Sequence, residues 1–163
     1  MEARNLQKLK RWSITHIAAI AAEAIPVFPT AFTYLHIKAI DYPSFRLSPY
    51  FDQVADFINN AITSENGTVY VHCQMGISRS ATCVIAYLMK YHDMSYDKAR
   101  FFVQSKRSII YPNPGFQRQL IRYEKTLISR KTGKGLVDLN TNEKSGSFIF
   151  KAKTSKFEEE KQP

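Results

Sequence analysis

The stretch VYVHCQMGISRSATCVIAYLMK, residues 69–90, sets a short polar loop between a β-rich run and a long apolar helix. Residues 68–71 are rich in strand-forming residues and follow directly after Gly67, as expected of a strand. The apolar pattern from about Arg79 to Tyr91 predicts a helix. The stretch therefore predicts the order strand, tight loop, helix, which is typical of α/β proteins.

The segments before this unit also predict a helix and strands. Apolar residues recur at helical spacing over residues 6–12, and residues 14–20 have the pattern of a buried strand. A second strand is expected over residues 32–40 and ends before Pro43, because proline interrupts the hydrogen-bond ladder of a sheet. Asp41 should then lie on a loop just beyond the carboxyl end of that strand.

Helices are expected to fill most of the remaining sequence. Ser48-Pro49 supply an N-cap and a first helical residue, and one apolar face continues from there until Asn66-Gly67. Ser95 and Asn113-Pro114 start two further helices. These segments predict an α/β fold with a central, mainly parallel, twisted sheet of about four to five strands flanked by helices.

Length and composition favour one globular domain followed by a tail. The chain has 163 residues, 44 % of them hydrophobic, which suits a single domain with a real core. From residue 129 the composition shifts to lysine, serine, threonine, glycine and asparagine, so residues 129–163 are expected to form a basic, mostly disordered tail. No apolar stretch approaches the ~20 residues that cross a bilayer, and no secretory signal is evident, which favours the cytosol or nucleus.

Net charge and cysteine content limit the classes of partner, metal and cofactor that the chain is expected to bind. The net charge of +9 favours anionic partners, but the basic residues lack the interleaved aromatic side chains of nucleic-acid-binding surfaces. Cys73 and Cys83 are too few for a disulfide scaffold and do not have zinc-ligand spacing, so no metal and no cofactor are expected. A lone cysteine is more often inert than catalytic, so Cys73 has to be judged by its neighbours.

The loop after the strand has the groups that a phosphate monoester requires. Backbone N–H groups between a strand end and a helix N-terminus form an anion-binding nest, and these groups together with Arg79 would stabilise a thiolate at Cys73. The planar guanidinium of Arg79, six residues on, can bind two phosphate oxygens. Gly76 permits close approach of the backbone to the anion. The expected phosphate-binding loop comprises Cys73, Gln74, Met75, Gly76, Ile77, Ser78 and Arg79.

Three residues beside or within one helix turn of the loop have more than one interpretation. The Ser80 hydroxyl can donate to the sulfur and ease departure of the thiolate, or it can simply cap the helix. His72 is expected to orient the loop through a backbone hydrogen bond rather than to carry a proton. Cys83 reads as a packing residue, with a thiol that resolves an oxidised Cys73 as the alternative.

The sequence HCQMGISRSAT resembles the signature loop of the protein tyrosine phosphatase superfamily. With YPNPGFQRQL downstream, residues 3 to 128 are similar to the dual-specificity phosphatases, including the MAP-kinase-phosphatase and slingshot types. This resemblance implies a catalytic domain over residues 1–128, Cys73 as nucleophile, and hydrolysis of phosphotyrosine and phosphoserine/threonine through a phospho-cysteine. Relative to the family pattern, the first edge strand is missing.

The resemblance also implies two residues outside the loop. Asp41 occupies the place of the family's general acid, with a plain turn residue as the alternative. Asp52 and Asp56 are rivals, but both fall inside a predicted helix. Asn113 matches a position that supports the loop, and it can also cap the last helix.

Substrates and competing functions follow from the same residues. The uncharged loop side chains favour a phosphoprotein over a polyphosphorylated lipid, and a protein kinase is a candidate partner because Arg130-Lys131 and residues 136–139 have the order of a docking peptide. A pseudophosphatase that binds phosphopeptides without turnover is the alternative function, and an RNA 5′-triphosphatase is disfavoured by the uncharged loop. The sequence leaves the oligomeric state open.

Overall fold

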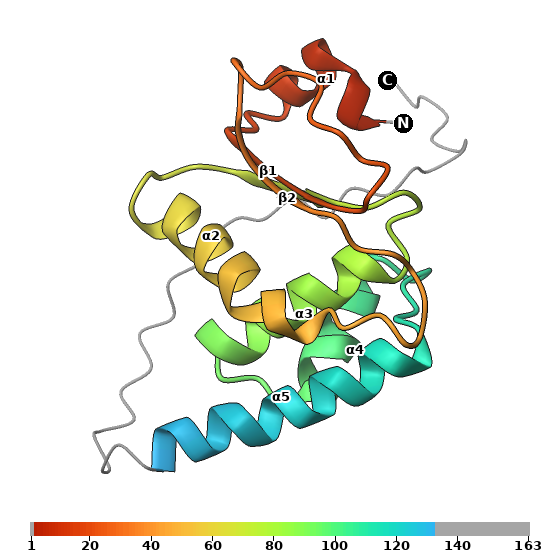
Figure 1. Cartoon of the computed structure of the whole chain (residues 1–163). Helices are drawn as coiled ribbons and strands as arrows, with labels where there is room; N and C mark the ends of the chain where they lie inside the picture. Colours follow the sequence, from red (N-terminus) through yellow and green to blue (C-terminus); the bar gives the residue numbers. More distant parts are fainter. Residues whose placement is uncertain (1, 133–163) are drawn as a thin grey trace, which may run out of the picture.

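The computed structural model of the chain describes residues 2–132 (Figure 1). Its elements are, in order, η1 (Glu2–Arg4), α1 (Leu6–Arg11), β1 (His16–Ile20), β2 (Thr33–Ile37), η2 (Ser48–Tyr50), α2 (Phe51–Thr63), β3 (Val69–His72), α3 (Arg79–Tyr91), α4 (Tyr96–Lys106) and α5 (Pro114–Thr132). The expected α/β fold is confirmed.

A small parallel sheet forms the centre of the fold. Its strand order is β2-β1-β3, and His16 of β1 pairs with Thr33 of β2 on one side and with Val69 of β3 on the other. The expected number of four to five strands is wrong for the described residues, where the sheet has three. Every described segment after β3 is helix or loop, because its apolar residues recur at helical rather than strand spacing.

Helices cover the sheet unequally (Figure 1): α1 lies on one face, and α2 to α5 lie on the other. Successive side chains of β1 alternate between the two sides, as a strand requires. Ile17 packs with Leu9 of α1, whereas Ala18 and Ile20 join the larger core beneath. The central helix is α3, whose residues 79–89 are all buried, so the residues at its N-terminus are held rigidly.

The helix ends differ from expectation at two places. Ser95 does cap α4, accepting a hydrogen bond from the Lys98 amide. Ser48, however, is the first residue of the short η2, whose N-cap is Leu47, so Ser48 caps no helix with its side chain. Residues 129–132 belong to α5 rather than to the expected tail, because the helical apolar pattern continues through Ile128. The rest of that tail, residues 133–163, lies outside the described residues.

None of the helices between residues 2 and 132 combines the length and apolarity that a bilayer span needs.

Candidate active site

Cys73 lies at the base of the loop that joins β3 to α3. It follows the last residue of β3 directly and is 4 % exposed. The Gly76 amide donates a hydrogen bond to its Sγ at 3.2 Å, and the Ser80 Oγ lies at the same distance on the α3 side. Gly76 has a φ of +65°, a conformation that favours glycine. The loop therefore curls back so that its own backbone meets the sulfur.

Arg79 binds the scaffold through one nitrogen of its guanidinium and leaves another without a hydrogen-bond partner among residues 2–132. Its Nη1 donates to both carboxylate oxygens of Glu23, at 2.9 and 3.1 Å, and to the Ala39 carbonyl at 3.1 Å. Its Nε is buried, has no hydrogen-bond partner in the described part of the chain, and lies 3.7 Å from Asp41 Oδ2. A buried guanidinium N–H without a partner is a donor that an incoming anion can satisfy.

Asp41 lies on the loop after β2, four residues beyond Ile37, and faces the phosphate loop. Its Oδ1 accepts hydrogen bonds from Ser78 Oγ at 2.8 Å and from Asn113 Nδ2 at 2.9 Å. Asn113 also caps α5, because its Oδ1 accepts a hydrogen bond from the Phe116 amide at 3.0 Å. The side chain of Asn113 thus caps α5 and binds Asp41, while its backbone N–H donates to the loop residue Ser78 at 3.1 Å. Asp52 and Asp56 lie in α2 and are bound to Lys90 instead.

Arg107, at the end of α4, holds the outer side of the loop. Its Nε donates to the Gly76 carbonyl at 2.8 Å and its Nη2 to the Met75 carbonyl at 3.0 Å. In a planar trans peptide the C=O and N–H point in opposite directions, so an outward Met75 carbonyl turns the Gly76 N–H inward, toward Cys73. Burial lowers the pKa of Arg107, while the charge of Cys73 acts to raise it.

The sequence analysis did not single out Glu23 or Arg107. Glu23 follows β1 by three residues, just as Asp41 follows β2, and the carboxyl ends of parallel strands meet at one edge of the sheet. The position of Glu23 just after a strand could therefore have identified it as a candidate site residue from the sequence. Arg107 carried no such signal, because an arginine at a helix end is ordinarily a solvated charge.

His72 and Cys83 are buried next to the loop residues. His72 Nδ1 lies 3.3 Å from the Cys73 carbonyl, its ring stacks on Tyr70 at 5.1 Å, and burial lowers its pKa. Cys83 lies fully buried one turn into α3, and burial raises the pKa of its thiol. Among the other loop residues, Gln74 and Met75 are exposed, whereas Ser78 is buried.

Within residues 2–132, no group of three or more histidine, cysteine, aspartate or glutamate side chains is placed to hold a metal ion.

The comparison with protein families matches residues 2–126 to the family model described as the dual specificity phosphatase catalytic domain. Dual specificity protein phosphatase 1B of Arabidopsis thaliana is 46 % identical over 126 residues, which cover 77 % of this chain and 75 % of that protein. Slingshot homolog 3 of Rattus norvegicus is 40 % identical over 129 residues, covering 79 % of this chain and 20 % of that protein.

Solved structures agree with the sequence relatives. The human tyrosine phosphatase-like serine/threonine/tyrosine-interacting protein matches with a TM-score of 0.72 and 36 % identity, covering 78 % of this chain and 88 % of that one. A mouse putative dual specificity phosphatase matches with a TM-score of 0.74 and 29 % identity, covering 79 % and 80 %. The chain therefore belongs to the dual specificity phosphatase family of the protein tyrosine phosphatase superfamily and is a protein-tyrosine/serine/threonine phosphatase.

Proposed function

We propose that the chain hydrolyses phosphotyrosine and phosphoserine/threonine in proteins through a phospho-cysteine formed on Cys73. The observation that carries this proposal is the position of the sulfur, 3.2 Å from both the Gly76 amide and the Ser80 hydroxyl, at the base of a loop that also presents a buried Arg79. The amide donates to the sulfur, and the hydroxyl can donate to it whenever the sulfur carries negative charge. Burial of the sulfur restricts attack to a group that enters the loop.

In the first step the Cys73 thiolate attacks the phosphorus, the new S–P bond forms, and the P–O ester bond breaks. The Nε of Arg79 and the amides of Gly76, Ile77 and Ser78, whose preceding carbonyls are held by Arg107 and Tyr111, bind the equatorial oxygens, where negative charge is concentrated. Asp41 supplies the proton to the departing oxygen. Ser78 and Asn113 both bind Oδ1, so Oδ2 is the oxygen left to carry that proton.

In the second step water attacks the phospho-cysteine, and the S–P bond breaks to release inorganic phosphate. The Asp41 carboxylate takes the proton of the attacking water, which restores the acid for the next cycle. Sulfur leaves as a thiolate. The Ser80 hydroxyl, 3.2 Å away, can donate to it as the negative charge returns.

The substrate class rests on the side chains of the loop. Gln74, Met75, Ile77 and Ser78 carry no charge, so the loop offers nothing to match the additional phosphates of a polyphosphorylated lipid. A phosphoprotein meets the loop through one phosphate group. Cytosol or nucleus is the proposed location, because both cysteines are free and a catalytic thiol needs a reducing compartment.

A protein kinase is a second proposed partner. Arg130 and Lys131 of the suggested docking peptide lie in α5, where they pair with Asp52 and Asp93. Residues 136–139 of that peptide lie outside the described residues. Binding of phosphopeptides without turnover is not favoured, because Cys73, Arg79 and Asp41 are all brought together at one loop.

The test is turnover of a small aryl phosphate by the purified chain and by Cys73→Ser. We expect the wild type to turn over and Cys73→Ser to lose at least about 1,000-fold, because the nucleophile is gone. Cys83→Ala is the matched control and should retain most of the activity, because this second cysteine lies inside α3. A wild type that binds vanadate or a phosphopeptide but shows neither burst nor turnover would establish the binding function instead.

A further inference from the structure

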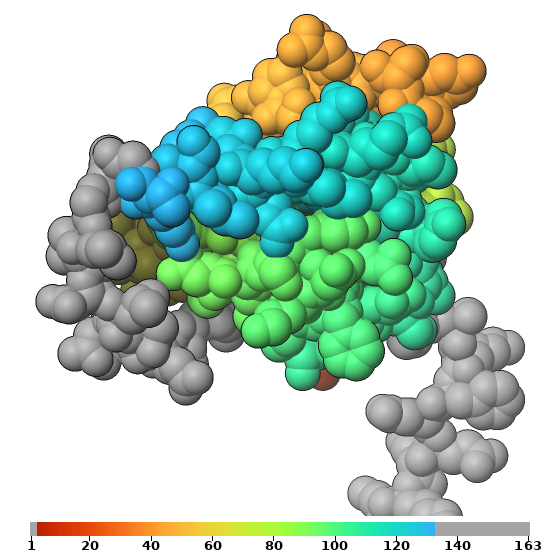
Figure 2. All heavy atoms as spheres, turned by 90° about the horizontal axis from the view of Figure 1, so that it is seen from below, coloured from red at the N-terminus to blue at the C-terminus, as the bar shows by residue number. Residues whose placement is uncertain are grey.

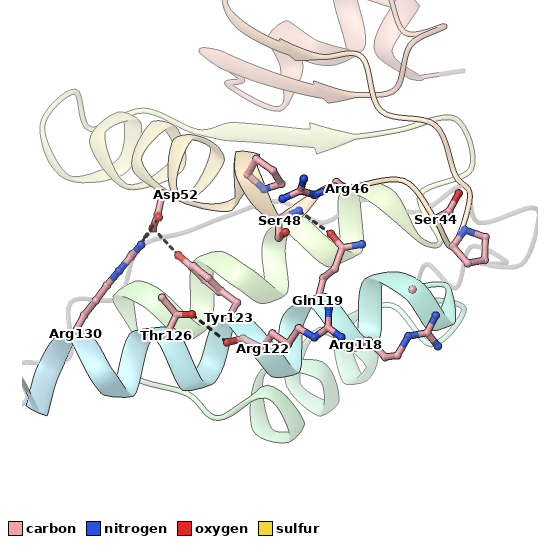
Figure 3. A pocket seen from close by; sticks show the side chains of 13 residues that line it. Ser44, Arg46, Ser48, Asp52, Arg118, Gln119, Arg122, Tyr123, Thr126 and Arg130 are labelled. Carbon is pink, nitrogen blue, oxygen red and sulfur yellow. Dashed lines mark hydrogen bonds and ion pairs between the residues drawn. The ribbon is translucent and has the colours of Figure 1, made fainter.

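A groove of about 640 Å³ lies beside the active site, on the face formed by α5 and by the segment from Pro43 to Pro49 (Figures 2 and 3). Figure 2 shows α5 in cyan running beside the orange segment that leads into η2 and α2. Most of the charged side chains that line the groove are basic: Arg46, Arg118, Arg122 and Arg130, against the single carboxylate of Asp52.

The two ends of the groove differ in how their charges are balanced. At the far end Arg130 pairs with Asp52 at 3.0 Å, and Tyr123 donates to the same carboxylate. At the end nearer the active site, Arg118 and Arg122 rise from successive turns of α5, with Arg46 on the segment above (Figure 3). None of these three arginines has a carboxylate partner among residues 2–132.

The charges of Arg118 and Arg122 are not offset by ion pairs among residues 2–132. Arg118 and Arg122 are four residues apart, so their like charges weaken the helix slightly. Both are exposed, and neither reaches a carboxylate of the described part of the chain that would offset the repulsion. The groove concentrates positive charge even though the repulsion between these arginines destabilises α5. Such a groove is suited to an anionic occupant.

The groove is also fixed to the loop that carries Asp41. Gln119 accepts hydrogen bonds from the Leu47 and Ser48 amides and donates to the Phe45 carbonyl, each at 2.8 Å. Gly115 packs against Pro43 so closely that an added Cβ would lie 1.8 Å from the Pro43 carbonyl oxygen. The groove wall and the Asp41 loop are therefore one continuous, braced segment.

We propose that this groove binds an acidic segment, rich in aspartate and glutamate, of the same phosphoprotein whose phosphate enters the Cys73 loop. The inference deepens the proposed function and rests on it for the place of the phosphate. Guanidinium groups bind carboxylates through paired hydrogen bonds, and three of them would select for local acidity.

A single peptide is long enough to place its phosphate in the Cys73 loop and its acidic segment in the groove. Pro43 lies two residues from Asp41, at most ~7 Å along the chain. Arg122 lies seven residues beyond Gly115, roughly 10 Å along the helix axis. An extended peptide therefore spans from the phosphorylated side chain to Arg122 in about six residues.

The test compares two phosphopeptides that share one core, one with four glutamates and one with four glutamines over the six residues on either side of the phosphorylated residue. The measured quantity is the ratio of kcat/KM for the acidic over the neutral peptide. We expect the wild type to prefer the acidic peptide by about tenfold at low salt, and Arg118→Glu/Arg122→Glu to abolish or reverse the preference. Lys125→Glu is the matched control, because it reverses a charge on the same helix outside the groove; it should keep the preference.

Several outcomes overturn the proposal. One is a wild type without preference, and another is an unchanged ratio in Arg118→Glu/Arg122→Glu. If Glu158→Gln/Glu159→Gln/Glu160→Gln raises activity equally on both peptides, and Arg118→Glu/Arg122→Glu abolishes that rise, the occupant is the chain's own acidic cluster. Fluorescence anisotropy measures the affinity of Cys73→Ser for both peptides. This measurement tests whether the groove prefers the acidic peptide even if the wild type has no turnover. Failure of the groove is thereby distinguished from failure of the proposed reaction.

Discussion

Two side chains of the site divide their polar atoms between the scaffold and the reaction. Arg79 donates from Nη1 to Glu23 and Ala39, whereas its buried Nε has no hydrogen-bond partner among residues 2–132. Asn113 gives Oδ1 to the start of α5 and Nδ2 to Asp41. Because each group is held at one end, the other end is presented with little loss of rotamer freedom when a phosphate binds.

Asp41→Asn should separate substrates by the basicity of their leaving group. Phosphopeptides, whose alkoxide or phenoxide must be protonated, should lose about 100-fold or more in kcat, whereas an aryl phosphate with a good leaving group should lose less than about tenfold. Steady-state kinetics on both substrates measure the difference. Equal losses on both would assign Asp41 a structural role, since it also receives hydrogen bonds from Ser78 and Asn113.

Glu23→Gln tests whether the Glu23 carboxylate positions Arg79. The substitution removes the charge that meets Nη1 while keeping the shape, so we expect KM for phosphopeptides to rise by about fivefold to tenfold with a smaller change in kcat. Burial raises the pKa of Glu23, but its hydrogen bond from Arg79 contributes to a net lowering, so the carboxylate is ionised at neutral pH. Glu65→Gln, remote from the loop, is the control. An unchanged KM in Glu23→Gln would show that the Ala39 carbonyl suffices.

At the scale of elements, the phosphate loop is held by the strand before it, the helix after it and the end of a third element, α4. Strand β3 delivers Cys73, α3 begins at Arg79, and the end of α4 supplies Arg107, which binds the carbonyls of Met75 and Gly76. The Ile77 carbonyl is likewise occupied by the Tyr111 amide at 2.9 Å. With these carbonyls held outward, the loop is preorganised for an anion.

Arg107→Lys should therefore impair catalysis more than stability. Lysine keeps the charge but cannot reach two carbonyls from a planar fork. We expect kcat/KM to fall by about tenfold to 100-fold, with a loss of about 1–2 kcal/mol in the free energy of unfolding for the two hydrogen bonds. Kinetics and urea unfolding measure the two effects, and Arg11→Lys, an exposed residue of α1, is the control. A variant with wild-type kinetics would show that the loop holds its shape unaided.

At the scale of the whole molecule, helices on one side of the sheet are tied together across the chain. Asp52 of α2 meets Lys90 of α3 at 2.9 Å and Tyr123 and Arg130 of α5. Burial raises the pKa of Asp52, but the hydrogen bonds from these three residues lower it to about 2. The network thus links the helix that carries the loop to the two helices that flank it.

Stability should fall on mild acidification because the fold lowers the pKa of two histidines, the buried His72 and the more exposed His92. Burial lowers the pKa of both His72 and His92 below the ordinary value of 6.5. The unfolded chain then binds more protons than the folded one, so stability present above pH ~6.5 is lost as the pH falls toward the lowered pKa values. We expect the urea midpoint to decrease from pH 7.5 to pH 5.5. His72→Gln should flatten this dependence, and a midpoint independent of pH in the wild type would contradict the expectation.

Local chemistry made much of the site predictable from the sequence. A thiol, a glycine and an arginine at fixed spacing between a strand and a helix can only close around an anion, and α3 begins and ends at the residues expected. Asp41 was placed from the end of its strand, and Asn113 from the start of its helix. These assignments depend on short-range geometry, which sequence spacing specifies.

Other features depended on long-range packing. The strand count, the partner of Arg79 and the role of Arg107 follow from how segments 30 to 60 residues apart meet, as the pairs Arg79 with Glu23 and Arg107 with Gly76 show. The groove on α5 exists only because Gln119 and Gly115 hold a distant loop against that helix. The sequence by itself thus determined which residues are the candidates for the chemistry, because their types and spacing are local, whereas the tertiary structure decided what positions them, because such contacts depend on the packing of the whole chain.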